Sequence, residues 1–173
     1  MTSLIPLTIE ATQYLVSGYP DGLIVIWDLV SRKAFQKLYN NPIVAVYSLT
    51  TLTYENKPYL VSGENPNISF WDLTTFKVAF TLQGAHQSKI NTLLPFTMDS
   101  QQYLISGSGV CAKYCTDTLV VVWDLKSRKS AWSTDRQSYI SHSFLILKKD
   151  NDTFLVTVDF SGFTCGNSLL KNI

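Results

Sequence analysis

The dipeptide Trp-Asp occurs three times in this chain of 173 residues, and each copy closes a run of β-branched or aromatic residues and is followed by leucine. Because the apolar residues of these runs are nearly consecutive instead of alternating, they predict strands that are covered on both faces. Such strands need other elements packed above and below them, and further copies of the same unit are the natural candidates. The three copies are Trp27-Asp28, Trp71-Asp72 and Trp123-Asp124.

A second recurring segment gives the spacing of this unit. It reads Leu-Val-Ser-Gly or Leu-Ile-Ser-Gly and begins at Leu15, Leu60 and Leu104, at steps of 45 and 44 residues. A weaker copy begins at Leu155. A repeat period of this size is typical of proteins in which each unit buries its apolar faces against its neighbours.

Each unit is expected to form four short antiparallel strands joined by turns. Asp21-Gly22 in the first unit is a strong hairpin signal, since glycine accepts positive φ without strain. The apolar runs of that unit predict strands at residues 3–9, 13–17, 23–27 and 34–38. The units span approximately residues 1–40, 41–84, 85–136 and 137–173, and the last of them is incomplete.

These units resemble the WD40-repeat family, whose repeats of about 40 to 45 residues are four-stranded blades of a β-propeller. The resemblance covers essentially the whole chain. It implies an all-β fold of about three and a half four-stranded antiparallel blades in an open or incomplete arc.

The resemblance also implies a hydrogen-bonded tetrad in each blade. In that family the tetrad consists of a His before the first strand, a Ser or Thr of the second strand, an Asp of the following turn and the Trp of the third strand. The third unit supplies all four as His86, Ser106, Asp117 and Trp123. The equivalent positions are Ser17, Asp21 and Trp27 in the first unit and Ser62, Asn65 and Trp71 in the second.

The tetrad is interpreted as a structural network because a buried tryptophan must place its indole N–H on an acceptor. A Ser/His/Asp catalytic triad is disfavoured, since the sequence contains nothing that resembles a nucleophile elbow or an oxyanion-hole motif. We therefore expect no catalytic residue, no enzymatic activity and no cofactor.

Candidate partner contacts lie in two places. The connection from the second to the third strand is longest in the third unit, where Lys113 and Tyr114 either form a protruding contact or belong to a tolerated surface insertion. A lysine also follows each motif Trp by six residues, as Lys33, Lys77 and Lys129. The row could meet phosphates or acidic partners, but 14 basic against 13 acidic residues favour solvated turns and disfavour nucleic acid as a partner.

Two weaker motifs lie near the third Trp-Asp. Cys111 and Cys115 lack the further ligands expected around a zinc ion, so no metal site is predicted. The segment from Trp123 to Lys126 is similar to the WDxR-type box by which some family members dock on ubiquitin-ligase adaptors, with Lys where that box has Arg.

The ends of the chain and its cysteines bear on location and completeness. The first residues show no signal peptide, no run is long enough to span a membrane, and three cysteines make no disulfide framework. We expect a cytoplasmic protein, with the nucleus as the alternative compartment. Met1 aligns inside a first strand, so the chain is expected to be a fragment of a longer propeller, a half that pairs with further blades or with a second copy, or an unusual four-bladed ring.

The family resemblance implies a non-enzymatic scaffold that binds other proteins, whose identity the sequence does not reveal. One alternative is a propeller that binds phosphoinositide or nucleic acid through the basic rim. Another is a substrate adaptor of a ubiquitin ligase. A propeller enzyme is disfavoured because the sequence shows no acid, metal-ligand or phosphate-binding motif.

Overall fold

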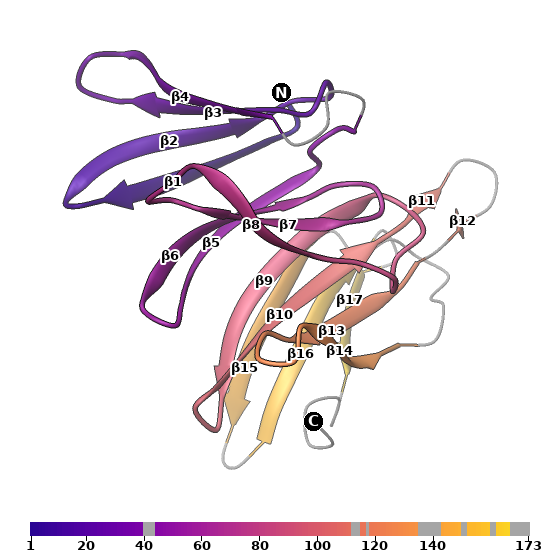
Figure 1. Ribbon diagram of the computed structural model, residues 1–173. Helices are drawn as coiled ribbons and strands as arrows, with labels where there is room; N and C mark the ends of the chain where they lie inside the picture. The colour runs from indigo at the N-terminus through magenta and orange to yellow at the C-terminus, as the bar shows by residue number, and fades with distance from the viewer. Residues whose placement is uncertain are drawn as a thin grey trace. The chain divides into compact units, whose positions relative to one another are not determined.

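Strands are the regular elements throughout the part of the chain that the computed structural model describes (Figure 1). Among these residues there is no helix long and apolar enough to cross a membrane. The chain divides into two compact units, Met1–Gln83 and Gly84–Ile173. The described residues are 1–39, 44–111, 115–116, 118–134, 143–149, 152–159 and 162–166.

The first unit consists of two four-stranded antiparallel sheets, each with its strands in sequence order. We call them sheet 1 and sheet 2. Sheet 1 is formed by β1 (Ser3–Ile9), β2 (Thr12–Gly18), β3 (Leu23–Asp28) and β4 (Lys33–Tyr39). Sheet 2 is formed by β5 (Ser48–Tyr54), β6 (Lys57–Gly63), β7 (Ile68–Asp72) and β8 (Lys77–Leu82).

The second unit contains a four-stranded sheet 3, a three-stranded sheet 4 and a two-stranded ladder. Sheet 3 is formed by β9 (Ile90–Met98), β10 (Gln101–Ser108), β13 (Val120–Asp124) and β14 (Lys129–Ser133). Sheet 4 is formed by β15 (Ser143–Lys149), β16 (Asp152–Asp159) and β17 (Gly162–Gly166). The ladder pairs β11 (Val110–Cys111) with β12 (Cys115–Thr116). The predicted all-β class with four-stranded antiparallel blades is thereby confirmed.

Sheet 4 has a third strand that the sequence pattern did not place. In the other sheets the leucine of the recurring segment stands opposite the motif tryptophan, as Leu15 does opposite Trp27. Leu155 of sheet 4 stands opposite Gly166 instead. The indole is therefore replaced by a residue without a side chain, which explains why the Trp-Asp pattern misses this strand.

Two-residue turns connect the first two strands of sheets 1 to 3. Both residues of each turn have positive φ, between 47° and 66°. Positive φ at both positions is the backbone of a type I′ turn, whose twist matches that of the paired strands. The turns are Glu10-Ala11, Glu55-Asn56 and Asp99-Ser100. Few of these are residue types that favour positive φ, so the pairing of the strands, rather than local preference, selects the turn.

The sheets pack face to face within each unit in one repeated manner. The Trp face of a sheet is the face that carries its motif tryptophan, or in sheet 4 the face that carries Leu155; the opposite face is the back face. In the first unit the back face of sheet 1 packs on the Trp face of sheet 2, and in the second unit the back face of sheet 3 packs on the Trp face of sheet 4. The first contact includes Tyr14, Val16 and Ile26 with Leu60, Trp71 and Leu73; the second includes Tyr103, Ile105 and Val122 with Phe144 and Leu155.

Candidate functional site

The motif tryptophan of sheets 1 to 3 donates its indole N–H to the serine of the recurring Leu-Val/Ile-Ser-Gly segment on the neighbouring strand. This bond gives a buried or half-buried indole the acceptor that it needs. The Nε1–Oγ distances are 2.8 Å for Trp27 and Ser17, 2.9 Å for Trp71 and Ser62, and 2.7 Å for Trp123 and Ser106.

In sheet 3 a histidine extends this network. Nε2 of His86 lies 2.6 Å from Oγ of Ser106, and the His86 and Trp123 rings are 6.1 Å apart. All three side chains are buried, with His86 3%, Ser106 0% and Trp123 2% exposed. The structure thus brings together three residues of the predicted tetrad; the fourth, Asp117, lies outside the described residues.

In sheet 2 a glutamate occupies the corresponding place. The Ser62 hydroxyl donates a hydrogen bond of 2.9 Å to Oε1 of Glu64, which is 4% exposed. Asn65, which sequence alignment placed in the tetrad, is exposed. The sequence pattern did not single out Glu64, because a lone glutamate after a strand is ordinarily solvated. Its position two residues after the serine that recurs in each repeat is the signal that could have found it.

In sheet 1 a tyrosine occupies this place. The Ser17 hydroxyl lies 3.3 Å from Oη of Tyr19, again two residues after the serine. Asp21 is exposed, and its Oδ1 accepts the backbone N–H of Leu23 at 3.3 Å. Asp21 therefore lies in the turn between β2 and β3, where it accepts a backbone N–H at the end of that turn. The Trp-Ser bond is common to the three sheets, whereas the third group of the network is Tyr, Glu or His.

The aspartate of each Trp-Asp motif caps the turn that follows. Oδ1 of Asp28 accepts the backbone N–H groups of Val30 at 2.7 Å and Ser31 at 2.9 Å. Oδ1 of Asp72 accepts the backbone N–H of Thr74 at 2.7 Å, and Asp124 accepts that of Lys126 at 2.8 Å. These are Asx turns, in which a carboxylate replaces a backbone acceptor.

The capping bonds hold the pKa of all three carboxyls below the ordinary value of 3.8. For Asp28 the cause is the backbone N–H groups of Ser31 and Val30, and for Asp72 it is the hydroxyl and backbone N–H of Thr74. For Asp124, burial is the largest influence and raises the pKa, but the hydrogen bonds from Lys126, Ser127 and Gln101 together outweigh it, so the pKa is lowered. The charged form is favoured in each case because it accepts these bonds more strongly.

A pH-dependent stability follows from these shifts. Because the folded pKa values lie below 3.8, the stability that the three carboxylates contribute is complete above pH 3.8 and is lost as the pH falls through the folded pKa values. In urea unfolding, we expect Asp72→Asn to be less stable than the unaltered chain at pH 7, since the neutral amide oxygen accepts the Thr74 bonds more weakly than the carboxylate does. The variant should lose less free energy of unfolding than the unaltered chain between pH 4 and pH 2. Equal losses on acidification would contradict the role given to Asp72.

The lysines that follow the motif are exposed and lie opposite its aspartates. In register, Lys33 pairs with Asp28, and the same pairing recurs in sheets 2 and 3. Each basic group therefore stands beside an acidic one, which weakens the field that a polyanion would meet. The other two pairs are Lys77 with Asp72 and Lys129 with Asp124.

The insertion in the third unit is described in part. Its backbone forms the β11–β12 ladder, in which Cys111 stands opposite Cys115. Lys113 and Tyr114 lie outside the described residues. Among the residues that the structure does describe, no group of three or more His, Cys, Asp or Glu side chains could hold a metal ion.

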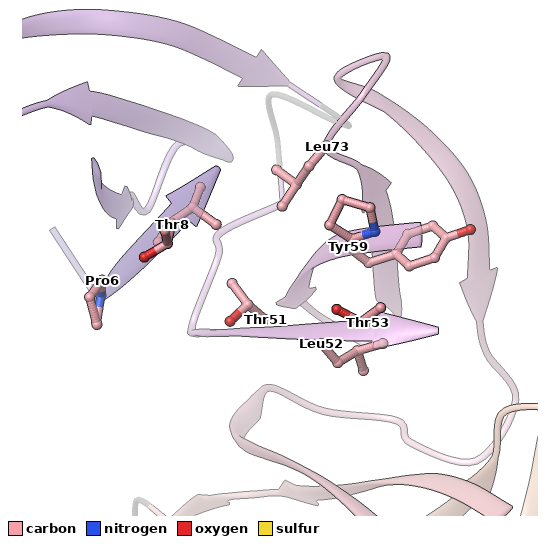
Figure 2. A pocket seen from close by; sticks show the side chains of 9 residues that line it. Pro6, Thr8, Thr51, Leu52, Thr53, Tyr59 and Leu73 are labelled. Atoms are coloured by element: carbon pink, nitrogen blue, oxygen red, sulfur yellow. The ribbon is translucent and has the colours of Figure 1, made fainter. Parts of the chain in front are cut away.

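A groove lies on the first unit where sheets 1 and 2 meet, at the end that carries the β1–β2 and β7–β8 turns. Figure 2 shows Pro6 and Thr8 of β1 on one side of it, and Thr51 of β5 and Leu73 from the β7–β8 turn on the other. The groove has a cavity volume of about 430 Å³. Its lining residues carry no formal charge: they are Pro6, Leu7, Thr8, Thr51, Leu52, Thr53, Pro58, Tyr59 and Leu73.

The groove continues into a second hollow of about 480 Å³ that shares Thr8, Pro58 and Leu73 with it. This part has an aromatic wall. The centroid of the Phe35 ring lies 5.0 Å from that of the Tyr14 ring and 5.8 Å from that of the Phe76 ring. Phe35 is 48% exposed, so a large apolar surface is offered to solvent at this end. We call the two hollows together the seam groove.

No known protein-family model matches the chain, and no curated protein matches it. Among solved structures, the chain is similar to that of the computationally designed Ika8 protein, with a TM-score of 0.66 and 22% sequence identity. The match covers 96% of this chain and 45% of the designed one, so the chain spans less than half of that protein. At this identity the likeness shows the fold alone, which is β-propeller-like.

Proposed function

We propose that the chain is a WD40-type repeat protein that acts as a non-enzymatic scaffold and binds a peptide segment of another protein in the seam groove. The repeated Trp-Asp-Leu triplets with their Trp-Ser bonds support the family. A scaffold needs surfaces rather than reactive groups, and the geometry offers such a surface on the first unit.

The observation that carries the proposal is the composition of the seam groove. Threonine hydroxyls can bond to a peptide backbone, while prolines, Leu73 and the Phe35 wall can take apolar side chains. Each of the two hollows falls within the range of about 300–1,000 Å³ found for pockets that bury ligands. The lining carries one formal charge, the carboxylate of Glu10 in the second hollow, and is otherwise aromatic, aliphatic or hydroxyl-bearing. Such a surface suits an extended, apolar peptide segment. The expected partner segment is therefore extended, apolar and without acidic groups.

The burial of the polar networks supports the absence of catalysis in this proposal. Ser106 would be the nucleophile of a Ser/His/Asp arrangement, but its hydroxyl accepts the Trp123 indole at 2.7 Å and the residue is 0% exposed. A nucleophile must reach the reacting atom of a substrate. Ser106 is instead enclosed by the side chains to which it is bonded, as expected of a structural group.

The test is selection of binders from a random peptide display library on the immobilised chain, followed by affinity measurement with the selected peptides. We expect sequences that are rich in apolar residues and lack acidic ones, since Glu10 lines the second hollow. Phe35→Glu should weaken their binding at least about tenfold, which corresponds to about 1.4 kcal/mol. Its folding should be little affected, because Phe35 is half exposed.

Val30→Glu is the matched control, since Val30 is 86% exposed and does not line the seam groove. It adds the same charge and should leave binding unchanged. Selection of acidic peptides whose binding survives Phe35→Glu but is lost with Lys77→Glu would contradict the proposal. That result would favour a polyanion on the basic rim.

A further inference from the structure

The Trp face of sheet 1 is open, whereas the same residues of sheet 2 are covered. The triplet Trp-Asp-Leu offers an internal comparison. Trp71 is 3% and Leu73 4% exposed, and both belong to the core formed with the back face of sheet 1. Their counterparts in sheet 1 are a half-buried Trp27 and Leu29, which is 49% exposed. Leu4 on β1 is 48% exposed. The apolar side chains of a Trp face are thus present on sheet 1 without the sheet that covers them elsewhere.

The back face of sheet 4 is open in the same way. Leu145 and Leu147 on β15 are 54% and 46% exposed. They stand opposite Val156 and Phe154 of β16, so the four side chains form one continuous apolar face. Single exposed leucines are common on protein surfaces, but a contiguous apolar face marks a site of interaction.

Each contact within a unit joins the back face of one sheet to the Trp face of the next. The open face of sheet 4 is a back face, and the open face of sheet 1 is a Trp face. The positions of Leu145, Leu147, Phe154 and Val156 in sheet 4 match those of Ile5, Leu7, Tyr14 and Val16 in sheet 1. In sheet 1 these residues form the back face that receives the Trp face of sheet 2. The matching residues of sheet 3, Leu94, Phe96, Tyr103 and Ile105, receive the Trp face of sheet 4.

We propose that the back face of sheet 4 binds the Trp face of sheet 1 of a second copy of the chain, and that the second copy returns the same contact. The interface would then repeat the packing that joins sheets 1 and 2 and sheets 3 and 4. Each copy gives one face of each kind, so two equal contacts close the pair and leave neither face exposed. The length of the chain agrees, since one copy covers 45% of the designed propeller-like protein and two copies correspond to about nine-tenths of it.

Light scattering and sedimentation of the full chain over a wide range of concentration test this proposal. We expect a species of twice the 19.5 kDa chain mass. Leu29→Asp and Leu145→Asp should each weaken the pairing at least about a hundredfold, because a carboxylate would be buried in an apolar contact. Both residues are about half exposed in the single chain, so both variants should fold. Val30→Asp is the control. Thr74 holds the corresponding position in sheet 2 and remains exposed although sheet 2 packs on sheet 1, so Val30 is expected to stay outside the contact.

Mixing the two variants gives a second test. Each variant alone damages both contacts of its pair, whereas a mixed pair keeps one contact intact, between the Trp face of the Leu145→Asp chain and the back face of the Leu29→Asp chain. The mixture should therefore recover mixed pairs that neither variant forms alone.

A chain that stays monomeric at every concentration would overturn the proposal, and so would pairs that survive both substitutions. Open assemblies of many copies would overturn the closed pair. A monomer that Leu29→Asp and Leu145→Asp destabilise equally would show that the two faces meet within one chain. The peptide-binding proposal is independent of these outcomes, because none of the exposed leucines of the two open faces lines the seam groove.

Discussion

Replacing Trp123 by alanine is expected to lower the free energy of unfolding by about 3–5 kcal/mol. The side chain is 2% exposed, so the substitution removes a large buried apolar surface and leaves a cavity. It also removes the N–H that Ser106 accepts, and Ser106 in turn contacts His86. Since domains of ordinary size are stable by only about 5–15 kcal/mol, the loss should be plain in urea unfolding followed by circular dichroism.

Trp27→Ala is the matched comparison for this effect. Trp27 makes the same bond to a serine, at 2.8 Å, but its ring is half-buried. Its substitution should therefore cost clearly less than that of Trp123, when both are measured at concentrations where the chain is monomeric. If the two substitutions cost the same, burial of the indole would not be the source of the stability. A cost of Trp27→Ala that grows with protein concentration would instead agree with pairing through the Trp face of sheet 1.

The strands could be predicted from the sequence because two signals agree there. In sheet 1 the predicted ranges 3–9, 13–17, 23–27 and 34–38 lie within one residue at each end of β1 to β4. Apolar runs identify the strands, and the period of the repeat identifies equivalent runs in other units. The strand β17 escaped this reasoning because it carries Gly166 where the other sheets carry tryptophan.

The third member of each polar network could not be predicted in the same way. Motif comparison proposes one residue type for one place, whereas the structure uses Tyr19, Glu64 and His86 beside equivalent serines. Burial of Glu64 depends on what surrounds the end of β6, which local sequence does not encode. A buried serine hydroxyl can be satisfied by any of these three side chains, so the chemistry is kept while the residue type varies.

The seam groove lay beyond prediction for a different reason. Its walls come from β1, β5 and the β7–β8 turn, which are up to 70 residues apart in the sequence, as Pro6 and Phe76 are. Each lining residue alone is an ordinary strand or turn residue. The groove exists only because sheets 1 and 2 pack face to face, and its shape is set by that contact rather than by any one motif.

The second large effect is expected for Gly107→Val, at the end of β10. A Cβ at this position would lie 2.6 Å from Cζ of Phe144 and 2.8 Å from Cγ2 of Thr92. Both distances are far below van der Waals contact, and Phe144 is 8% exposed in the core between sheets 3 and 4. Because a packed core yields only by shifting side chains or backbone, valine should cost about 3 kcal/mol in urea unfolding.

A double-mutant cycle distinguishes this clash from a general intolerance of the strand. Phe144→Ala alone should be destabilising, because the ring is buried. In combination with Gly107→Val, however, the valine gains the space that the ring has left. The double variant should therefore lose about 1–3 kcal/mol less free energy of unfolding than the sum of the two single losses. Gly84→Ala is the contrast, since a Cβ there meets nothing within 4 Å and only its φ of 91° opposes the substitution. If the losses at Gly107 and Phe144 were simply additive, the close approach of sheets 3 and 4 at the Ser-Gly pair would be refuted.

The corresponding glycine of the first unit is Gly18, where a Cβ would lie 2.7 Å from Cγ1 of Val46. A cost of similar size for Gly18→Val would mean that the Ser-Gly pair serves both chemistry and packing: the serine holds the indole, and the glycine makes room for the next sheet.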